Sequence, residues 1–277
     1  IIFLLLFFLT RSVVWILVLK VLGHNINPQK GIYSLSMAET KRYIPGNIVG
    51  FISRVTHFNK YNISNQDIIK AIFFESMIFF LAAVVMSIPA ILMLQSQLQK
   101  FVNPLILIST LFIFLIAILT TIYFFFYLTF NLARQFKTNF QKMSGIFLLM
   151  CFSWLLFGIG NYLIATSLTY LDPNYLIQIS SLFALAWLIG YISIIAPLGL
   201  GVREAVIAGG LSFFIPLPLS SLIALISRIL MILSEILFLL ITKVASSLKP
   251  HSFSLSWQMF TLAISSATYS IYFIYVT

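Results

Sequence analysis

Residues 195–204 read Ile-Ala-Pro-Leu-Gly-Leu-Gly-Val-Arg-Glu, and this stretch decides how the chain can fold. The residues on either side, 173–202 and 205–227, carry no Asp, Glu, Lys or Arg. Pro197 lacks an amide donor and disrupts a helix, while Gly199 and Gly201 give the backbone freedom. We therefore predict a broken helix at membrane depth, where irregular backbone is tolerated if protein buries it or it faces a water-filled cavity.

Two charges, Arg203 and Glu204, follow the break directly. Ionisable residues within a membrane are costly, so they mark a functional site by default. The alternative is an ordinary loop between two spans, with both charges at the membrane interface.

The composition gives the class of protein. The chain is 61% hydrophobic and 8% charged, more apolar than a soluble core of 277 residues can bury. We expect an all-α polytopic protein of the cell membrane, forming one integral membrane domain over residues 1–277. The net charge of +10 does not indicate nucleic-acid binding, because the bases lie at the ends of apolar runs, where they meet lipid headgroups. The single cysteine, Cys151, excludes an internal disulfide.

Apolar runs of about 20 residues predict about seven full spans. Because the first residue already lies inside such a run, we expect an upstream segment to be missing. The predicted spans are 1–22, 68–94, 102–130, 143–171, 173–196, a span from the Pro216/Pro218 turn to 242, and 253–275.

A second break, Ile-Pro-Gly-Asn-Ile, contains Pro45 and Gly46. An offset of 153 residues places Gly46 on Gly199 and Glu75 on Arg228. We predict two repeats, at about 1–130 and 143–277, although chance alignment of apolar helices is the alternative. Between them, the basic segment 131–142 is expected to be a cytoplasmic linker, because Lys and Arg concentrate on that side.

The order of the spans agrees with a cytoplasmic segment 131–142 if each break is the tip of a re-entrant hairpin. The returning pieces, 46–58 and 202–214, each span about 20 Å as helix, against a hydrocarbon core of about 30 Å. The two hairpins then enter from opposite sides, so the repeats have inverted topology. Interrupted short segments in matching places of two halves indicate a transporter binding site.

The sequence Lys-Arg-Tyr-Ile-Pro-Gly at 41–46, together with Arg54, Glu75 and Pro-Leu-Gly-Leu-Gly-Val-Arg-Glu at 197–204, resembles the lysylphosphatidylglycerol synthetase transmembrane family. That family includes the flippase domain of bacterial multiple-peptide-resistance proteins. The resemblance implies an inverted-repeat fold with two re-entrant hairpins and movement of lipids between leaflets. It does not imply lysyl transfer, because the chain ends at Thr277 without the soluble aminoacyl-transferase domain.

Charged side chains near the two breaks are the candidate substrate-binding residues. A charge in the middle of a span costs about 2.5–3.5 kcal/mol, so we do not expect these side chains to face lipid. Arg228 and Glu235 are seven residues apart and share a helix face. The group either forms a headgroup path or locks the helices together, and Arg54 could instead reach the headgroup region. The candidates are Arg54, Glu75, Arg203, Glu204, Arg228 and Glu235.

We therefore expect a flippase that moves a phospholipid or polyprenyl-linked lipid with an anionic headgroup, and which lipid it moves stays open. A non-transporting scaffold is the main alternative, and a membrane lipid transferase is a weaker one. We expect no enzymatic activity, cofactor or metal, because the carboxylates form no Asp-x-Asp and the three histidines lack ligand spacing. A homo-oligomer is compatible with the sequence.

Overall fold

The computed structural model describes residues 1–43, 49–98, 123, 127, 140–193 and 199–247. Every regular element in this part of the chain is a helix, which confirms the predicted all-α class. Short 3-10 turns occupy Lys41–Tyr43, Asn59–Tyr61 and Pro173–Tyr175. The α-helices are α1 (Ile2–Val21), α2 (Pro28–Thr40), α3 (Val49–Phe58), α4 (Asn65–Leu98), α6 (Phe140–Thr166), α7 (Leu176–Ile192), α8 (Val202–Leu211) and α9 (Leu217–Ser247).

The described residues contain five helices that are long and apolar enough to cross a membrane, namely α1, α4, α6, α7 and α9. They match five of the predicted spans. The other two predictions, 102–130 and 253–275, fall almost entirely outside the described residues, so the count of seven stays a prediction. Two helices end earlier than predicted, α6 at Thr166 and α7 at Ile192.

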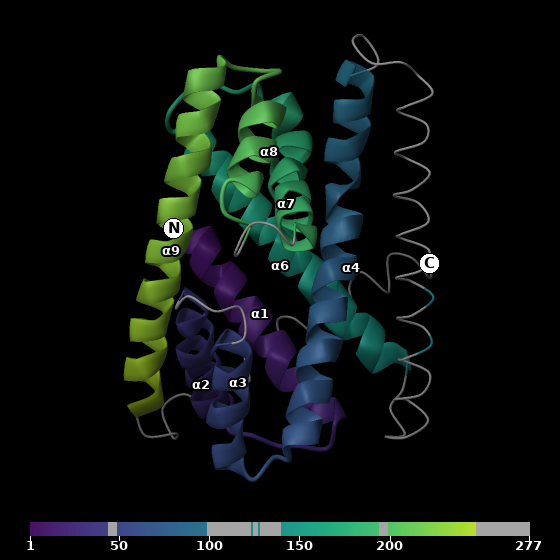
Figure 1. Cartoon of the computed structure of the whole chain (residues 1–277), viewed down its shortest axis with the longest axis vertical. Helices are drawn as coiled ribbons and strands as arrows, with labels where there is room; N and C mark the ends of the chain where they lie inside the picture. The colour runs from purple at the N-terminus through teal and green to yellow at the C-terminus, as the bar shows by residue number, and fades with distance from the viewer. Residues whose placement is uncertain (44–48, 99–122, 124–126, 128–139, 194–198, 248–277) are drawn as a thin grey trace, which may run out of the picture.

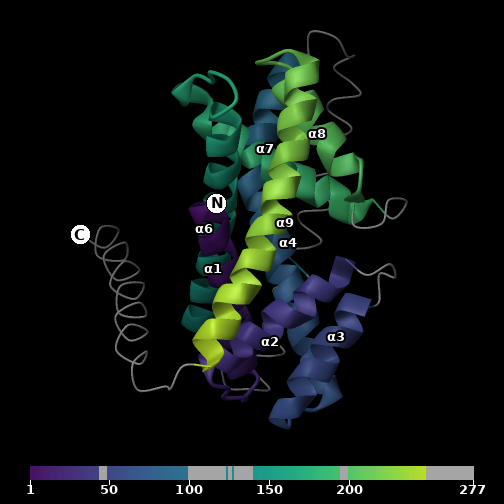
Figure 2. The ribbon, with the colours of Figure 1, turned by 90° about the vertical axis from the view of Figure 1, so that its left-hand side faces the viewer.

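The two longest helices frame the molecule. In Figure 1, α4 and α9 each extend over nearly its full height on opposite sides. The α2 and α3 helices lie in the lower half and α7 and α8 in the upper half, and Figure 2 shows the same division after a quarter turn. Between them, α1 packs against α6.

Both predicted breaks separate a longer helix from a short one that packs beside it. The described helical structure before the first break reaches Tyr43 and α3 follows that break, while α7 before the second break reaches Ile192 and α8 follows it. At 10 residues each, α3 and α8 are about 15 Å long, too short to cross a core of about 30 Å. Gly199 and Gly201 adopt positive φ angles of 68° and 82°, which glycine tolerates. The other predicted break residues, Pro45, Gly46 and Pro197, lie outside the described residues.

The 153-residue offset is reflected in the helix boundaries. Adding 153 to the bounds of α3 gives 202–211, the bounds of α8, and adding it to the start of α4 gives a position one residue from the start of α9. Under the same offset, α2 corresponds to α7, α4 to α9 and α1 to α6. The packing agrees with this correspondence, because α4 contacts α7, α9 contacts α2, and α1 contacts α6. These observations support two repeats, and the two-fold superposition of the halves stays a prediction.

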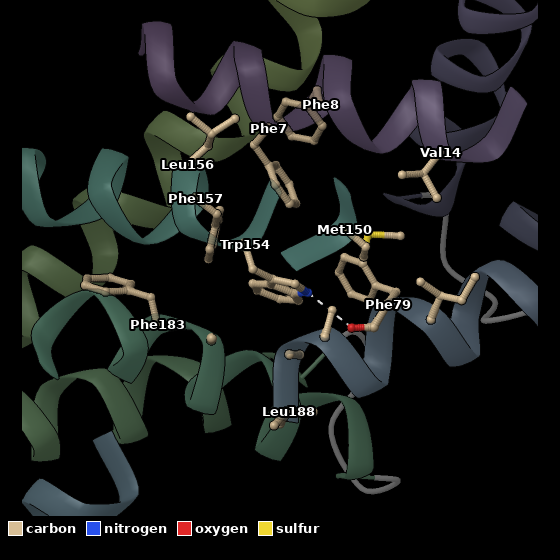
Figure 3. Packing of buried hydrophobic residues seen from close by; sticks show 14 of the residues in the cluster. Phe7, Phe8, Val14, Phe79, Met150, Trp154, Leu156, Phe157, Phe183 and Leu188 are labelled. Carbon is tan, nitrogen blue, oxygen red and sulfur yellow. Dashed lines mark hydrogen bonds between the residues drawn. The ribbon is translucent and has the colours of Figure 1, made fainter. Parts of the chain in front are cut away.

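An aromatic cluster fills the core between α1, α4, α6 and α7 (Figure 3). The Trp154 side chain is 1% exposed, and its indole Nε1 donates a hydrogen bond to the Phe79 carbonyl at 3.1 Å. The Phe79 and Trp154 ring centroids are 4.7 Å apart, and those of Phe7 and Phe157 are 5.0 Å apart. Such packing fixes the helix surfaces around the site, because buried aromatic pairs contribute beyond their buried area.

Candidate functional site

A cavity of about 520 Å³, here called the central cavity, is lined by residues from both halves of the chain. Its aromatic lining includes Phe79, Trp154 and Trp187. Among the described lining residues, four arginines face two glutamates, which leaves a surplus of two positive charges. These six residues are Arg11, Glu39, Arg54, Glu75, Arg203 and Arg228.

Four of the six charges form one network, here called the Arg54 network: Arg11, Glu39, Arg54 and Glu75. Arg54 donates from Nε to Glu39 Oε1 at 2.6 Å and from Nη1 to Glu75 Oε2 at 2.8 Å. Arg11 donates from Nε to Glu75 Oε1 at 3.1 Å and from Nη1 to Glu39 Oε2 at 3.4 Å. Each of the four carboxylate oxygens therefore accepts a hydrogen bond from a guanidinium, and the network is neutral overall.

The centre of the Arg54 network is buried. The Glu75 side chain is 1% exposed and that of Arg54 is 8% exposed. The Arg54 guanidinium lies 5.0 Å from the Trp15 ring centroid and that of Arg11 lies 4.9 Å from the Phe79 centroid. The network joins α1, α2, α3 and α4, so its geometry suits a structural role, because paired buried charges hold elements in register.

The other half of the cavity carries a simpler pair. Arg228 on α9 forms an ion pair with Glu204 Oε1 on α8. The second oxygen, Glu204 Oε2, accepts a hydrogen bond from the Gly201 amide at 2.7 Å, which caps the start of α8. The Arg228 and Glu204 side chains are 19% and 16% exposed, so this pair is more accessible than Arg54 with Glu75.

The remaining cavity arginine, Arg203, is held against an aromatic face. Its guanidinium carbon lies 3.6 Å from the Trp187 ring centroid, a cation–π distance. Gly190 and Gly199 leave the space for this side chain, since an added Cβ at Gly190 would overlap Arg203 Cγ and one at Gly199 would lie 3.0 Å from Arg203 Nε. The two glycines therefore set where the guanidinium lies.

The sequence of the chain matches a known protein family. Residues 1–238 match the family described as the lysylphosphatidylglycerol synthase TM region. The chain belongs to this family. The match confirms the resemblance seen in the sequence, and with the apolar helices it identifies a multi-pass protein of the cell membrane. No curated protein and no solved structure matches the chain significantly.

Within this family member, the structure brings five of the six predicted site residues to one place. Arg54, Glu75, Arg203 and Arg228 line the central cavity, and Glu204 pairs with Arg228 behind its wall. Glu75 and Arg228, which correspond under the 153-residue offset, both line this cavity, and each is paired within its own half. Their part in substrate binding stays a prediction.

The sixth predicted residue, Glu235, is not among the described residues that line the central cavity. Its side chain is buried, and its Oε2 accepts a hydrogen bond from the Tyr43 hydroxyl at 2.6 Å. Tyr43 immediately precedes the first break and Glu235 lies on α9, so this contact links the two halves. Its geometry places Glu235 at a packing contact beside the cavity.

The sequence analysis did not select Arg11 and Glu39, which complete the Arg54 network. The signal was present for Arg11, because a charge inside the apolar run 1–22 is as costly as the one at Arg228. Glu39 lies in a half-apolar segment, where an acid is unremarkable. The Trp187 and Gly190 contacts to Arg203 depend on tertiary packing and had no sequence signal.

Proposed function

We propose that this chain is a flippase that carries a phosphate-bearing lipid headgroup between leaflets through the central cavity. The observation that carries the proposal is the positive surplus in a cavity bounded by two broken-helix pairs in opposite halves of the molecule. A volume of about 520 Å³ lies within the roughly 300–1,000 Å³ of ligand pockets, so a headgroup fits while the acyl chains remain in lipid.

The two halves have different parts in this proposal. The carboxylates of the Arg54 network occupy its guanidinium donors on both of its arginines. Arg203, which lies against the Trp187 ring, and Arg228, which has the single described ion pair with Glu204, line the cavity from the short helix α8 and its neighbour α9. Planar guanidinium groups suit bidentate phosphate binding. We therefore assign the phosphate to Arg203 and Arg228.

A non-transporting scaffold is the second candidate, and the saturated Arg54 network is the observation that favours it. A network that holds four helices together needs no ligand to account for it. The two proposals differ in what they expect of Arg203. A flippase requires its guanidinium to face the central cavity, whereas a scaffold does not.

The test is reconstitution of the full chain into liposomes that contain a fluorescent phosphatidylglycerol. Leaflet exchange is followed by quenching from outside, and lipid analysis afterwards shows whether any new product has formed. We expect exchange above that of protein-free liposomes with no change in the lipid. Exchange should fall at least tenfold in Arg203→Ala, because truncating a buried charge contact costs about 2–5 kcal/mol.

The matched control is Lys243→Ala, which removes one positive charge from an exposed position of α9. It should exchange lipid as wild type does. Equal exchange in wild-type and protein-free liposomes would refute the flippase, and a new lipid product would support the transferase alternative.

A further inference from the structure

A second, smaller cavity of about 40 Å³, here called the rear cavity, lies between α6, α7, α8 and α9. It shares Trp187, Arg203, Arg228 and Met231 with the central cavity, so these side chains form the wall between the two. Glu204 lines the rear cavity and is not among the described residues that line the central one. Arg228 therefore faces both cavities, while its carboxylate partner faces the rear.

The carboxylate of Glu204 is fixed independently of Arg228. The Gly201 amide holds Oε2 at 2.7 Å, and Arg228 contacts Oε1. If Arg228 moves toward a ligand in the central cavity, Glu204 stays where the helix cap holds it. Its Oε1 then loses its partner in a poorly solvated place, which costs free energy unless the charge is neutralised.

The rear cavity can hold water that passes a proton from bulk solvent to that oxygen. Its volume exceeds the roughly 10–15 Å³ that one water molecule needs. Polar groups line it, including Asn161, which is 1% exposed, and Ser227, which is 3% exposed. Within the described part of the chain, the Ser227 hydroxyl has no hydrogen-bond partner, so it is available to water there.

We propose that Glu204 is a proton-binding site coupled to headgroup binding. A phosphate in the central cavity draws Arg228 away from Glu204, and Oε1 takes up one proton through water in the rear cavity. The inference rests on the proposed function and adds its coupling ion. The empty site has two arginines and one carboxylate, and binding one phosphate charge with one proton leaves its net charge unchanged.

The groups around Glu204 agree with this assignment. Arg228 faces it from α9 and Arg203 adjoins it on α8, while α6 and α7 contribute the uncharged Asn161 and Trp187. Across the central cavity, the Arg54 network is neutral and internally paired. On α9, Glu235 accepts a hydrogen bond from Tyr43. Within the described part of the chain, Arg228 is thus the charged partner whose departure changes the proton affinity of Glu204.

Reciprocal linkage gives the sign of the effect. Releasing Arg228 favours protonation of Glu204, so protonation of Glu204 equally favours release of Arg228 and binding of phosphate. The apparent Kd for the headgroup should fall as the pH falls, by up to about tenfold per pH unit for one coupled proton.

The experiment is calorimetric titration of the purified full chain in detergent with a short-chain phosphatidylglycerol. Its phosphodiester keeps one charge near neutral pH, unlike a phosphate monoester, whose second pKa is about 6. Comparing two buffers with different ionisation enthalpies gives the number of protons taken up per lipid bound. Wild type should approach one proton, and Glu204→Gln should bind lipid without proton uptake and without pH dependence.

The matched control is Asp67→Asn, the same carboxylate-to-amide change at the start of α4, where Asp67 contacts His24 and Lys70. It should keep the wild-type proton count. Lipid binding to wild type without proton uptake would overturn the inference and leave the flippase intact, as would unchanged uptake in Glu204→Gln. Absence of lipid binding to wild type would overturn both, and the wild-type result decides even if a variant does not fold.

Discussion

The ion pair between α3 and α4 and the ion pair between α8 and α9 occupy corresponding helices of the two halves with their signs reversed. In the first half, the short helix carries the base, Arg54, and the long helix carries the acid, Glu75. In the second half, the short helix carries the acid, Glu204, and the long helix carries the base, Arg228. Both pairs join a short helix to its long neighbour beside the same cavity.

The pairs differ in how completely they are satisfied. Arg54 and Glu75 belong to a network in which two further charged side chains, Arg11 and Glu39, complete the hydrogen bonding. Glu204 and Arg228 have fewer partners and greater exposure. A saturated network resists rearrangement, whereas a simple pair can exchange its partner for a ligand. We therefore propose that the first half contributes stability and that the second half binds the headgroup.

The largest effect on folding is expected from Arg54→Ala. The change removes the guanidinium that contacts both Glu39 and the buried Glu75, and breaking a buried pair costs about 3–5 kcal/mol. Thermal unfolding in detergent, followed by size-exclusion chromatography, should show a large fall in the unfolding temperature. If Arg54→Ala unfolds at the same temperature as the exposed-site variant Lys243→Ala, the first half is not the stabilising one.

A smaller loss is expected where the two halves meet. Tyr43→Phe removes the hydrogen bond to the buried carboxylate of Glu235, and such a bond to a charged group contributes about 1.5–3 kcal/mol. Tyr170→Phe, at a residue that is 82% exposed, should change stability by less than about 0.5 kcal/mol. Equal unfolding temperatures for the two variants would show that the Tyr43 contact does not join the halves energetically.

The position of Arg203 gives a third test. Gly190→Ala places a methyl group where Arg203 Cγ lies, so the side chain must leave the Trp187 face at a cost of about 1–3 kcal/mol. Leaflet exchange per folded molecule should fall. Gly209→Ala on α8, where an added Cβ meets nothing within 4 Å, should keep exchange and leave stability equal or about 1 kcal/mol higher. Exchange lost equally in both variants would contradict a specific role for Arg203.

Much of the helical framework followed from the sequence, because charge-free runs and Pro/Gly breaks are direct consequences of the membrane environment. The start of α8 at Val202 follows the predicted break, and the helix ends at Leu211. Helix ends within apolar sequence were less predictable. The α6 helix ends at Thr166 although the sequence stays uncharged to 171, because the absence of charge does not distinguish a turn from a helix.

The start of α2 carries a local sequence signal for a helix N-terminus. Residues 23–40 lie between the predicted spans 1–22 and 68–94, and the α2 helix begins there at Pro28. The Asn27 side chain accepts a hydrogen bond from the Gln29 amide at 3.0 Å, so Asn27 is the N-cap and Pro28 follows at the first helical position.

The candidate site could be predicted only in part, because the sequence shows which charges lie within spans but not which partners they have. The cost of a membrane charge picked out Glu75 and Arg228, but it does not say which partner satisfies each one. That choice depends on how α1 and α3 pack beside α4, which no local pattern contains. The division between a saturated and a simple pair therefore required the structure.

The most direct test of that division measures leaflet exchange per folded molecule for Arg228→Ala and Arg54→Ala beside wild type. Each protein is reconstituted at equal folded content, and its unfolding temperature is recorded in the same detergent. We predict that Arg228→Ala remains folded and loses at least tenfold in exchange, as truncating a charge contact worth about 2–5 kcal/mol requires. Arg54→Ala should lose stability while its folded fraction still exchanges lipid. Intact exchange per folded molecule in Arg228→Ala, together with lowered stability, would contradict the assignment of binding to the second half.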